Sequence, residues 1–384
     1  MSVTLDFTSA LYLGLRHPSR SLRSWPRFTT GKPAALQSPP SAEAIAGRLA
    51  ALQGCERVGL FPSTLHLFFD LFETLRREGV RLYIDSGAYP IARWGAERAA
   101  ARGVLLRMIP HYDPIAAQAI IERDRKSRLR PVILADGYCT DRGLSAPLKQ
   151  FLNSVIADNG YVVLDDTQAL GIFGTAPDQT NPYGRGGGGS LRLHKIHSPA
   201  VIVGSSLAKG FGVPLAALGG NRQLIRQVMR HSETRVHSSP PSVATLHAAE
   251  HALTLNRTRG DAIRLHLFEL VVRFRKQIKG MGISVSRSLF PVQALALDPH
   301  FNAVRLHRTL REAGVQTILA RNRDKSGAKL LFVFNASHSI IDVDCAAMLL
   351  DAAISAQFGS RRPNIDRQGW QFSPRLQSFP RRVV

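Results

Sequence analysis

The chain has 384 residues, of which 44% are hydrophobic, and this length allows a large core and more than one domain. It has no apolar run of the roughly 18 residues that a membrane helix needs, and we expect no signal peptide. Fifty Lys and Arg against 28 Asp and Glu give a net charge of +22, but the scattered arginines do not favour nucleic-acid binding and fit attraction of an anionic cofactor or substrate. Three cysteines without metal-ligand spacing favour a reduced, cytoplasmic setting.

The first predicted elements are a helix, a strand and a second helix. Ser41 is expected to cap a helix that runs to Gly54, and the apolar residues 57–61 predict a short strand. A small polar turn then leads into an apolar helix at 67–77. A helix N-terminus directly after a strand can bind a phosphate, because free backbone N–H groups and the helix dipole point at the anion. The same pattern is equally typical of an ordinary capped helix.

Apolar strands and helices then alternate along the chain. The pattern predicts strands at 80–85, 104–108, 130–137, 160–165, 200–204 and 215–220, and helices at 91–102, 147–158 and 221–231. Continuously apolar strands separated by helices predict an α/β fold, with a mostly parallel central sheet covered by helices. Ligands of such sheets collect at the carboxyl ends of the strands. Five polar side chains fall just past these ends: Thr64, Tyr89, Asp136, Asp165 and Lys209.

Lys209 and Asp165 have the chemistry of a pyridoxal-phosphate site. Lys209 follows an apolar strand and lies in a turn of small residues, where burial beside a bound group would turn it into a nucleophile or Schiff-base former. Pyridoxal phosphate needs a lysine for its aldehyde and a carboxylate to keep its ring nitrogen protonated. Asp165, or its neighbour Asp166, ends a second buried strand and can supply the carboxylate. The alternative is a lysine that merely ends a strand and a carboxylate that caps the next turn.

The last third of the chain predicts a separate α+β unit. Two long helical patterns cover about 242–280, and strands at 283–285, 292–297, 315–319 and 329–334 then mix with helices at 301–313 and 340–356. The glycine-rich run at 183–190 lacks the Lys-Ser/Thr of a P-loop and indicates a surface loop. We therefore divide the chain into an N-terminal arm (1–45), a large cofactor-binding α/β domain (46–240), connecting helices (241–280), a small C-terminal α+β domain (281–356) and an Arg-rich tail (357–384).

Four segments resemble motifs of the α-oxoamine synthases, the family of amino-oxononanoate synthase and glycine C-acetyltransferase. Residues 164–171 and 203–212 resemble the aspartate and lysine motifs of that family. Residues 5–15 resemble its N-terminal "F-S-S-N-x-Y-L-G-L" stretch, and residues 136–148 its "E-G-x-x-S-x-x-G-x-x-A-P-L" pattern. The resemblance covers roughly residues 5–355. It implies a fold-type I pyridoxal-phosphate transferase of the aminotransferase class I/II, which acts as a homodimer.

The resemblance also implies roles for individual residues. Lys209 would carry the cofactor aldehyde and Asp165 would pair with the pyridine nitrogen, and these two are the catalytic residues. The other implied cofactor contacts are Ser63, Thr64 and Leu65 at the phosphate, Tyr89 stacked on the ring, Asp136 and Thr140 at the glutamate and serine of the pattern, Gln168 at the ring hydroxyl, Ser206 at the phosphate, and Ser239, which borders the phosphate from the neighbouring subunit.

Three positions depart from the family pattern. Gln168 replaces a histidine, Ala10 replaces an asparagine that holds the substrate, and Lys329 stands where the family has the arginine for the substrate carboxylate. Arg321 or Arg323 could substitute for that arginine. Three functions therefore stay open: a transferase that joins an amino acid to an acyl thioester such as an acyl-CoA, an aminotransferase on the same fold, and a protein that keeps the fold without catalysis.

Overall fold

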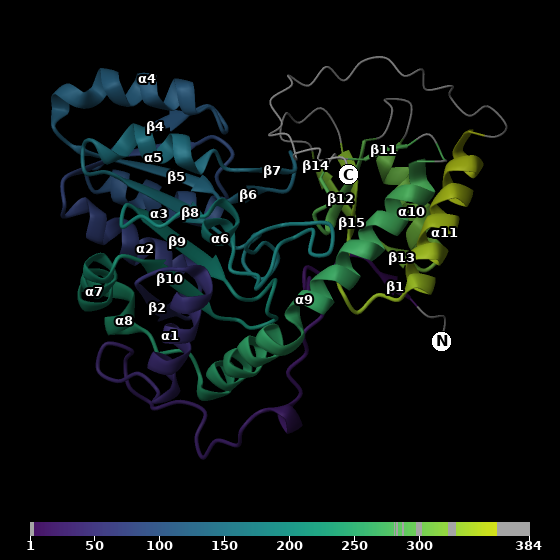
Figure 1. Ribbon diagram of the computed structural model, residues 1–384, viewed down its shortest axis with the longest axis horizontal. Coiled ribbons are helices and arrows are strands. Elements are labelled where there is room, and N and C mark those ends of the chain that lie inside the picture. The colour runs from purple at the N-terminus through teal and green to yellow at the C-terminus, as the bar shows by residue number, and fades with distance from the viewer. Residues whose placement is uncertain are drawn as a thin grey trace, which may run out of the picture.

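A seven-stranded sheet lies at the centre of the larger part of the protein in the computed structural model (Figure 1). The structure describes residues 4–279, 281, 283–285, 288–296, 302–321 and 328–358. The strand order is β2 (Arg57–Phe61), β10 (Ala216–Gly220), β9 (Val201–Ser206), β8 (Tyr161–Asp165), β5 (Arg130–Asp136), β3 (Val80–Asp85) and β4 (Leu105–Ile109). The last five of these strands are parallel, and β10 is antiparallel to both of its neighbours. The predicted α/β class is therefore confirmed.

The carboxyl ends of six strands meet at one edge of this sheet, which we call the carboxyl edge. Asp136 pairs with Asp165 in the register of β5 and β8, and Asp165 pairs with Gly204 of β9. Ala216 of β10 pairs with both Ser206, the last residue of β9, and Phe61, the last residue of β2. The carboxyl ends of β2 and β9 therefore flank β10 at the same edge. The residues that follow β2, β3, β5, β8 and β9 are thus brought to the same edge.

Two layers of helices cover the sheet, because alternate residues of each strand point to opposite faces. Val132 and Leu134 of β5 pack with α2 (Thr64–Arg76), α3 (Pro90–Ala101) and α7 (Arg222–His231), which α8 (Glu233–His237) follows. Ile133 and Ala135 of the same strand pack with α4 (Pro114–Asp124), α5 (Leu148–Ile156) and α6 (Ser190–His194). Burial on both faces explains why the inner strands are apolar, whereas the edge strand β4 is largely exposed.

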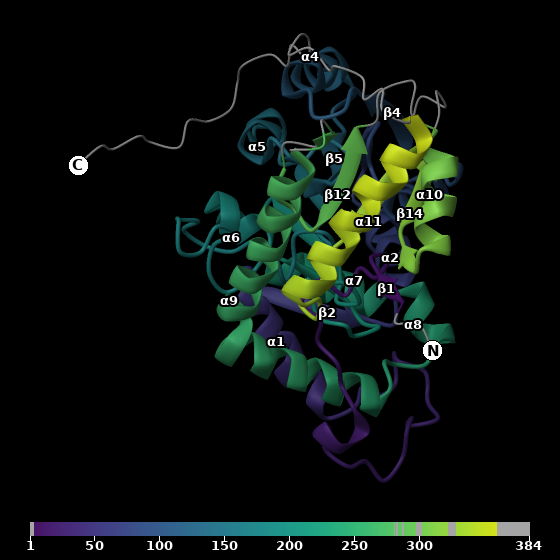
Figure 2. The ribbon, with the colours of Figure 1, turned by 90° about the vertical axis from the view of Figure 1, so that its right-hand side faces the viewer.

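A second unit follows the long helix α9 (Val243–Lys279). Its antiparallel sheet has the order β11 (Ser284–Val285), β12 (Val292–Ala296), β15 (Ala328–Val333) and β14 (Ile318–Arg321), and α10 (Ala303–Glu312) and α11 (Ile340–Phe358) pack beside it (Figure 2). The N-terminal strand β1 (Leu5–Asp6) pairs in parallel with β13 (Val315–Gln316), so the arm is anchored on this unit. The remaining elements are η1 (Ser19–Ser21), α1 (Ser41–Gln53), η2 (Arg125–Ser127), β6 (Tyr138–Cys139) and β7 (Leu144–Ser145).

Some local predictions are wrong. The glycine-rich run at 183–190 is not a surface loop, because Tyr183, Gly184 and residues 187–190 are buried. The strand expected at 315–319 is two strands, β13 and β14, which belong to different sheets. Ser41 does not cap α1 (Ser41–Gln53): it is the first helical residue, because Pro40 already has helical backbone angles, and no side chain caps this helix. The two helices expected at 242–280 are the single 37-residue helix α9. Its Gly260 lies against the side chains of Asn256 and Arg264, where an added Cβ would come within 2.6 Å of the Asn256 Oδ1, so this glycine serves close packing inside the helix.

Residues 359–384 of the predicted tail (357–384) and the end of the predicted strand at Leu297 lie outside the described residues. In the part of the chain that the structure describes, no helix has the length and hydropathy to span a membrane. The proposed domain boundaries stay predictions.

Candidate functional site

Lys209 lies on a tight turn at the carboxyl edge, between β9 and β10. The turn is closed by backbone hydrogen bonds from Leu207 N–H to the Leu215 carbonyl (2.8 Å) and from Phe211 N–H to the Leu207 carbonyl (3.0 Å). Gly212 ends it with a φ of +66°, and an added Cβ there would lie 2.7 Å from the Leu15 carbonyl of the N-terminal arm. The turn therefore needs glycine at this position and holds the lysine backbone firmly.

The Lys209 amine is partly buried and available for chemistry. Its Nζ lies 5.8 Å from the centroid of the Tyr89 ring, and no hydrogen bond or ion pair joins it to another of the described residues. Burial lowers the pKa of Lys209 below its usual value, although the negative charges of Asp165 and Asp136 act in the opposite direction. A lowered pKa enlarges the fraction of neutral, nucleophilic amine.

Two neighbouring aspartates at the end of β8 point to different surroundings. Asp165 is buried, and its Oδ1 accepts a hydrogen bond from Thr167 N–H at 3.0 Å. Burial raises the pKa of Asp165, and the charge of Lys209 opposes that rise. Asp166 instead turns toward Gly137 and Ser190, and its Oδ2 accepts from Ser190 N–H at 3.0 Å. Since alternate side chains lie on opposite sides of a strand, only Asp165 shares the surroundings of the lysine.

The loop before α3 places an aromatic ring beside the lysine. Tyr89 precedes α3 with an extended backbone, and its N–H donates to Asp136 Oδ1 at 2.8 Å. The carbonyl of Asp136 in turn accepts from the Tyr112 hydroxyl at 2.8 Å. These bonds tie the loop after β3 to the end of β5, so the half-exposed Tyr89 ring is held near Lys209. The sequence did not reveal the contribution of Tyr112, which depends on its positive φ of 54°.

The N-terminus of α2 also lies at the carboxyl edge. Ser63 caps this helix, because its Oγ accepts from His66 N–H at 3.5 Å and lies 2.8 Å from the His66 ring nitrogen. The first N–H groups of a helix have no partner within the helix, and Thr64 and Leu65 carry two of them. Ser206 ends β9 nearby: its N–H donates to Thr167 Oγ1 at 3.0 Å, and its own Oγ accepts from Ala208 N–H at 3.2 Å.

The remaining predicted site residues lie on neighbouring or more distant segments. Gln168 accepts a hydrogen bond from the buried Tyr12 hydroxyl at 2.7 Å. Thr140 is half-buried in the β6–β7 turn, next to Asp141, which forms an ion pair of 2.8 Å with Lys329. Ser239 is exposed between α8 and α9. Arg321, an alternative to Lys329 for the substrate carboxylate, is exposed at the end of β14. Arg323, the other alternative, lies outside the described residues.

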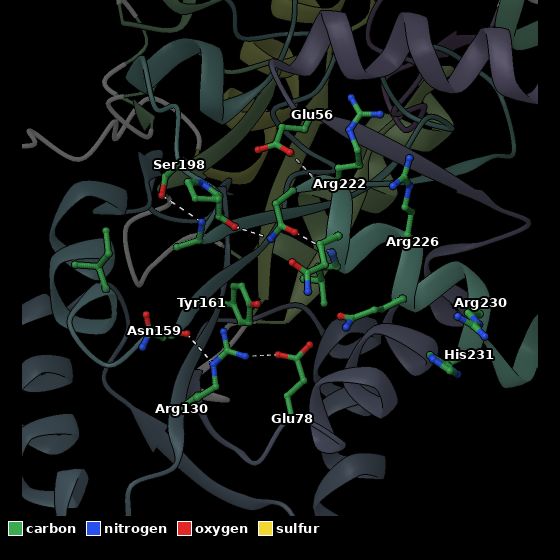
Figure 3. A pocket seen from close by; sticks show the side chains of 18 residues that line it. Glu56, Glu78, Arg130, Asn159, Tyr161, Ser198, Arg222, Arg226, Arg230 and His231 are labelled. Carbon is green, nitrogen blue, oxygen red and sulfur yellow. Dashed lines mark hydrogen bonds and ion pairs between the residues drawn. The ribbon is translucent and has the colours of Figure 1, made fainter.

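A separate cavity of about 1020 Å³ lies at the opposite edge of the sheet, where the parallel strands begin (Figure 3). Arg130 and Tyr161, the first residues of β5 and β8, line it together with Arg222 and Arg226 of α7. The Arg130 guanidinium pairs with Glu78 and lies 4.7 Å from the Tyr161 ring centroid. The full length of the strands separates this cavity from Lys209, so it is not part of the site at the carboxyl edge.

The residues at the carboxyl edge fit pyridoxal phosphate. They supply an amine without a partner among the described residues, a buried carboxylate that no arginine or lysine contacts directly in the described structure, an aromatic ring and a helix N-terminus. These are the groups that an aldehyde, a pyridinium, a flat ring and a phosphate require.

The fold and the groups at this edge resemble those of the fold-type I pyridoxal-phosphate transferases. No protein-family model matches the chain. Among curated proteins it is similar to 8-amino-7-oxononanoate synthase of Citrobacter koseri, with 25% identity over 359 residues, which cover 91% of this chain and 89% of the relative.

Among solved structures it is similar to a serine palmitoyltransferase with pyridoxal phosphate as an internal aldimine, with a TM-score of 0.80, 15% identity, and 92% and 88% of the two chains covered. The 8-amino-7-oxononanoate synthase of Francisella tularensis has a TM-score of 0.71 and 17% identity, with 92% and 99% covered. The chain is thus similar to α-oxoamine synthases in sequence and shares the fold of the solved structures, which confirms the resemblance seen in its motifs.

Proposed function

We propose that this protein is a pyridoxal-phosphate-dependent transferase that condenses an amino acid with an acyl thioester. The observation that carries the proposal is the Lys209 amine, which has no partner among the described residues and lies near the Tyr89 ring and the buried Asp165 carboxylate. The names of the relatives support the same class of reaction, because 8-amino-7-oxononanoate synthase and serine palmitoyltransferase both occur among them.

When bound, pyridoxal phosphate supplies an aldehyde for an amine and a protonated ring that withdraws electrons from the substrate. Lys209 would hold the aldehyde through its Nζ, and its lowered pKa favours the neutral amine that this bond requires. When it is not bonded to the cofactor, the same Nζ would be the base that removes the α-proton of the substrate. Asp165 would be the carboxylate that keeps the ring nitrogen protonated, and a positive ring would oppose the burial that raises the pKa of this carboxyl.

The other residues bind and orient. The backbone N–H groups of Thr64 and Leu65 and the hydroxyls of Ser63 and Ser206 would receive the phosphate at the N-terminus of α2. Tyr89, held by its hydrogen bond to Asp136, would cover the ring.

Lys329 is the proposed contact for the substrate carboxylate. It already pairs with Asp141, so a substrate carboxylate must compete with an internal one. Thr140 precedes Asp141 in the same turn. We propose that it contacts the cofactor, as the family resemblance implies.

A homodimer and a cytoplasmic location complete the proposal. The basis for the dimer is the segment around Ser239, which is exposed in the single chain and would border the phosphate of a neighbouring subunit. The family resemblance suggested both this contact and the two-fold assembly.

The direct test is reduction with borohydride after addition of pyridoxal phosphate, followed by peptide mapping. We expect a covalent adduct on Lys209 and none in Lys209→Ala. An adduct on another lysine, or a bound yellow chromophore that is not trapped on any lysine, would refute the assignment.

Turnover with amino acids, with and without acyl-CoAs, tests the reaction itself. Asp165→Asn should keep the fold and lower turnover by at least about 100-fold, because the ring nitrogen loses the charge that keeps it protonated. Asp166→Asn is the matched control, since Asp166 faces Gly137 and Ser190. Turnover of amino acid with a keto acid, without acyl-CoA, would indicate an aminotransferase. Absence of both reactions despite cofactor uptake would indicate a silent protein.

A further inference from the structure

Gln168 lies on a segment that touches the lysine turn at two places. Before the lysine, Ser206 N–H donates to Thr167 Oγ1 at 3.0 Å. After it, Gly171 packs on Gly210, where an added Cβ on Gly171 would lie 3.0 Å from the Gly210 Cα. Gln168 stands between these two contacts, on the chain that leaves Asp165, so its side chain begins beside the group that would be bound at Lys209.

Tyr12 of the N-terminal arm is a rigid partner for this glutamine. Its side chain is only 1% exposed, and its ring meets the edge of Phe290 at a centroid distance of 5.3 Å. The Tyr12 backbone is held as well, because its carbonyl accepts from Ala336 N–H at 2.8 Å. The Tyr12 hydroxyl donates to Gln168 Oε1 at 2.7 Å.

This hydrogen bond decides which way the glutamine amide faces. Burial raises the pKa of Tyr12 far above its usual value, so the phenol stays protonated and must donate its hydrogen. Gln168 Oε1 is the only acceptor of this hydroxyl among the described residues. With Oε1 directed to Tyr12, the two N–H donors of the amide point away from Tyr12 and are left for another neighbour.

We propose that Tyr12 is a positioning residue that fixes Gln168 as a hydrogen-bond donor to an anionic oxygen of the group bound at Lys209. This inference rests on the proposed function, in which that oxygen is the ring oxygen of pyridoxal phosphate. A glutamine amide does not titrate, so Tyr12 and Gln168 together present a donor whose protonation does not change with pH. The N-terminal arm thus contributes to the electrostatics of the site from a position 156 residues earlier in the chain.

The test is Tyr12→Phe, which removes the hydroxyl and keeps the ring that packs on Phe290. The protein is loaded with pyridoxal phosphate, and its visible absorption is titrated with pH. We expect Tyr12→Phe to bind the cofactor and to raise the pH midpoint of this titration by about one unit. This corresponds to a tenfold change in the ratio of the protonated to the unprotonated form of the bound cofactor. Without a fixed donor the ring oxygen keeps more negative charge, so it holds the proton shared with the Lys209 nitrogen more tightly.

A double-mutant cycle separates this role from simple packing. Gln168→Leu should raise the midpoint similarly, and Tyr12→Phe should add nothing in the Gln168→Leu background. Tyr138→Phe is the matched control: it lies in the same aromatic cluster, 4.7 Å from the Phe290 centroid, but its hydroxyl contacts Ser288, so its midpoint should equal that of the parent.

The outcomes are distinct. An unchanged midpoint in Tyr12→Phe, or additive shifts in the cycle, would overturn the inference and leave the proposed function standing. A parent protein that takes up no pyridoxal phosphate would overturn both. A Tyr12→Phe protein that does not fold would be replaced by Gln168→Glu, whose carboxylate cannot donate. It should shift the midpoint in the same direction, and an unchanged midpoint in Gln168→Glu would refute the inference.

Discussion

Replacing Asp166 by Asn should stabilise the protein above neutral pH. Asp166 is buried, and its pKa is raised from 3.8 to about 7, mainly by burial and also by the charge of Asp165, against the hydrogen bond from Ser190 N–H. A carboxyl group with a raised pKa in the folded state stabilises the fold fully below its unfolded pKa. This contribution is lost as the pH rises toward the folded pKa.

The size of the effect follows from the shift. About three pKa units at about 1.4 kcal/mol each correspond to about 4 kcal/mol, lost between pH 4 and pH 7 and constant above that. Asparagine avoids this loss because it does not ionise. Its carbonyl can accept from Ser190 N–H, and its amide can donate to the Ser190 Oγ, which has no hydrogen-bond partner among the described residues.

The assay is urea unfolding of the parent and of Asp166→Asn between pH 5 and pH 8. Unfolding is followed by tryptophan fluorescence, to which Trp94 on α3 contributes. The stability difference in favour of Asn should grow by about 2 to 3 kcal/mol over this range and level off above pH 7. Asp178→Asn is the control. Hydrogen bonds from Thr180 and Asn181 lower the pKa of this exposed carboxyl to about 2. It is therefore ionised in both the folded and the unfolded protein throughout this pH range, and its stability difference should not vary with pH. A difference that does not vary with pH would refute the reasoning.

Two further predictions concern stability. Arg264 is buried and donates to the Gly171 carbonyl (3.0 Å), Asn256 Oδ1 (2.8 Å) and Asp261 Oδ1 (2.6 Å). Arg264→Met should therefore destabilise the protein by about 3 to 5 kcal/mol in thermal or urea unfolding. The control, Arg259→Met at an exposed position of the same helix, should change the stability little. Gly47 is exposed inside α1, and no atom of the described residues lies within 4 Å of an added Cβ, so Gly47→Ala should stabilise the protein by about 1 kcal/mol. Gly95→Ala should destabilise it, because the added Cβ would lie 2.8 Å from the Phe68 carbonyl. An Arg264→Met protein as stable as its parent, or a destabilised Gly47→Ala, would contradict these arguments.

The sequence by itself determined the α/β class and the set of side chains at the carboxyl edge. Strands that are buried on both faces are apolar throughout, and this local property can be read without the fold. Once the strands are parallel, the residues after their ends must meet, as Asp136, Asp165 and Lys209 do. The family motifs added the expected partners of the cofactor, whose individual roles stay predictions.

Only the tertiary structure decided how those side chains face one another. It turned Asp165 toward Lys209 and Asp166 toward Gly137, and it joined Tyr12 to Gln168 across 156 residues. Lys329 likewise found Asp141, 188 residues away. Periodicity records whether a residue is buried, but a hydrogen-bond partner depends on how distant segments pack together. For the same reason the sequence wrongly predicted that Ser41 caps α1 and that two helices cover the span of α9. The helical backbone of Pro40 and the packing around Gly260 cannot be read from the neighbouring residues in the sequence.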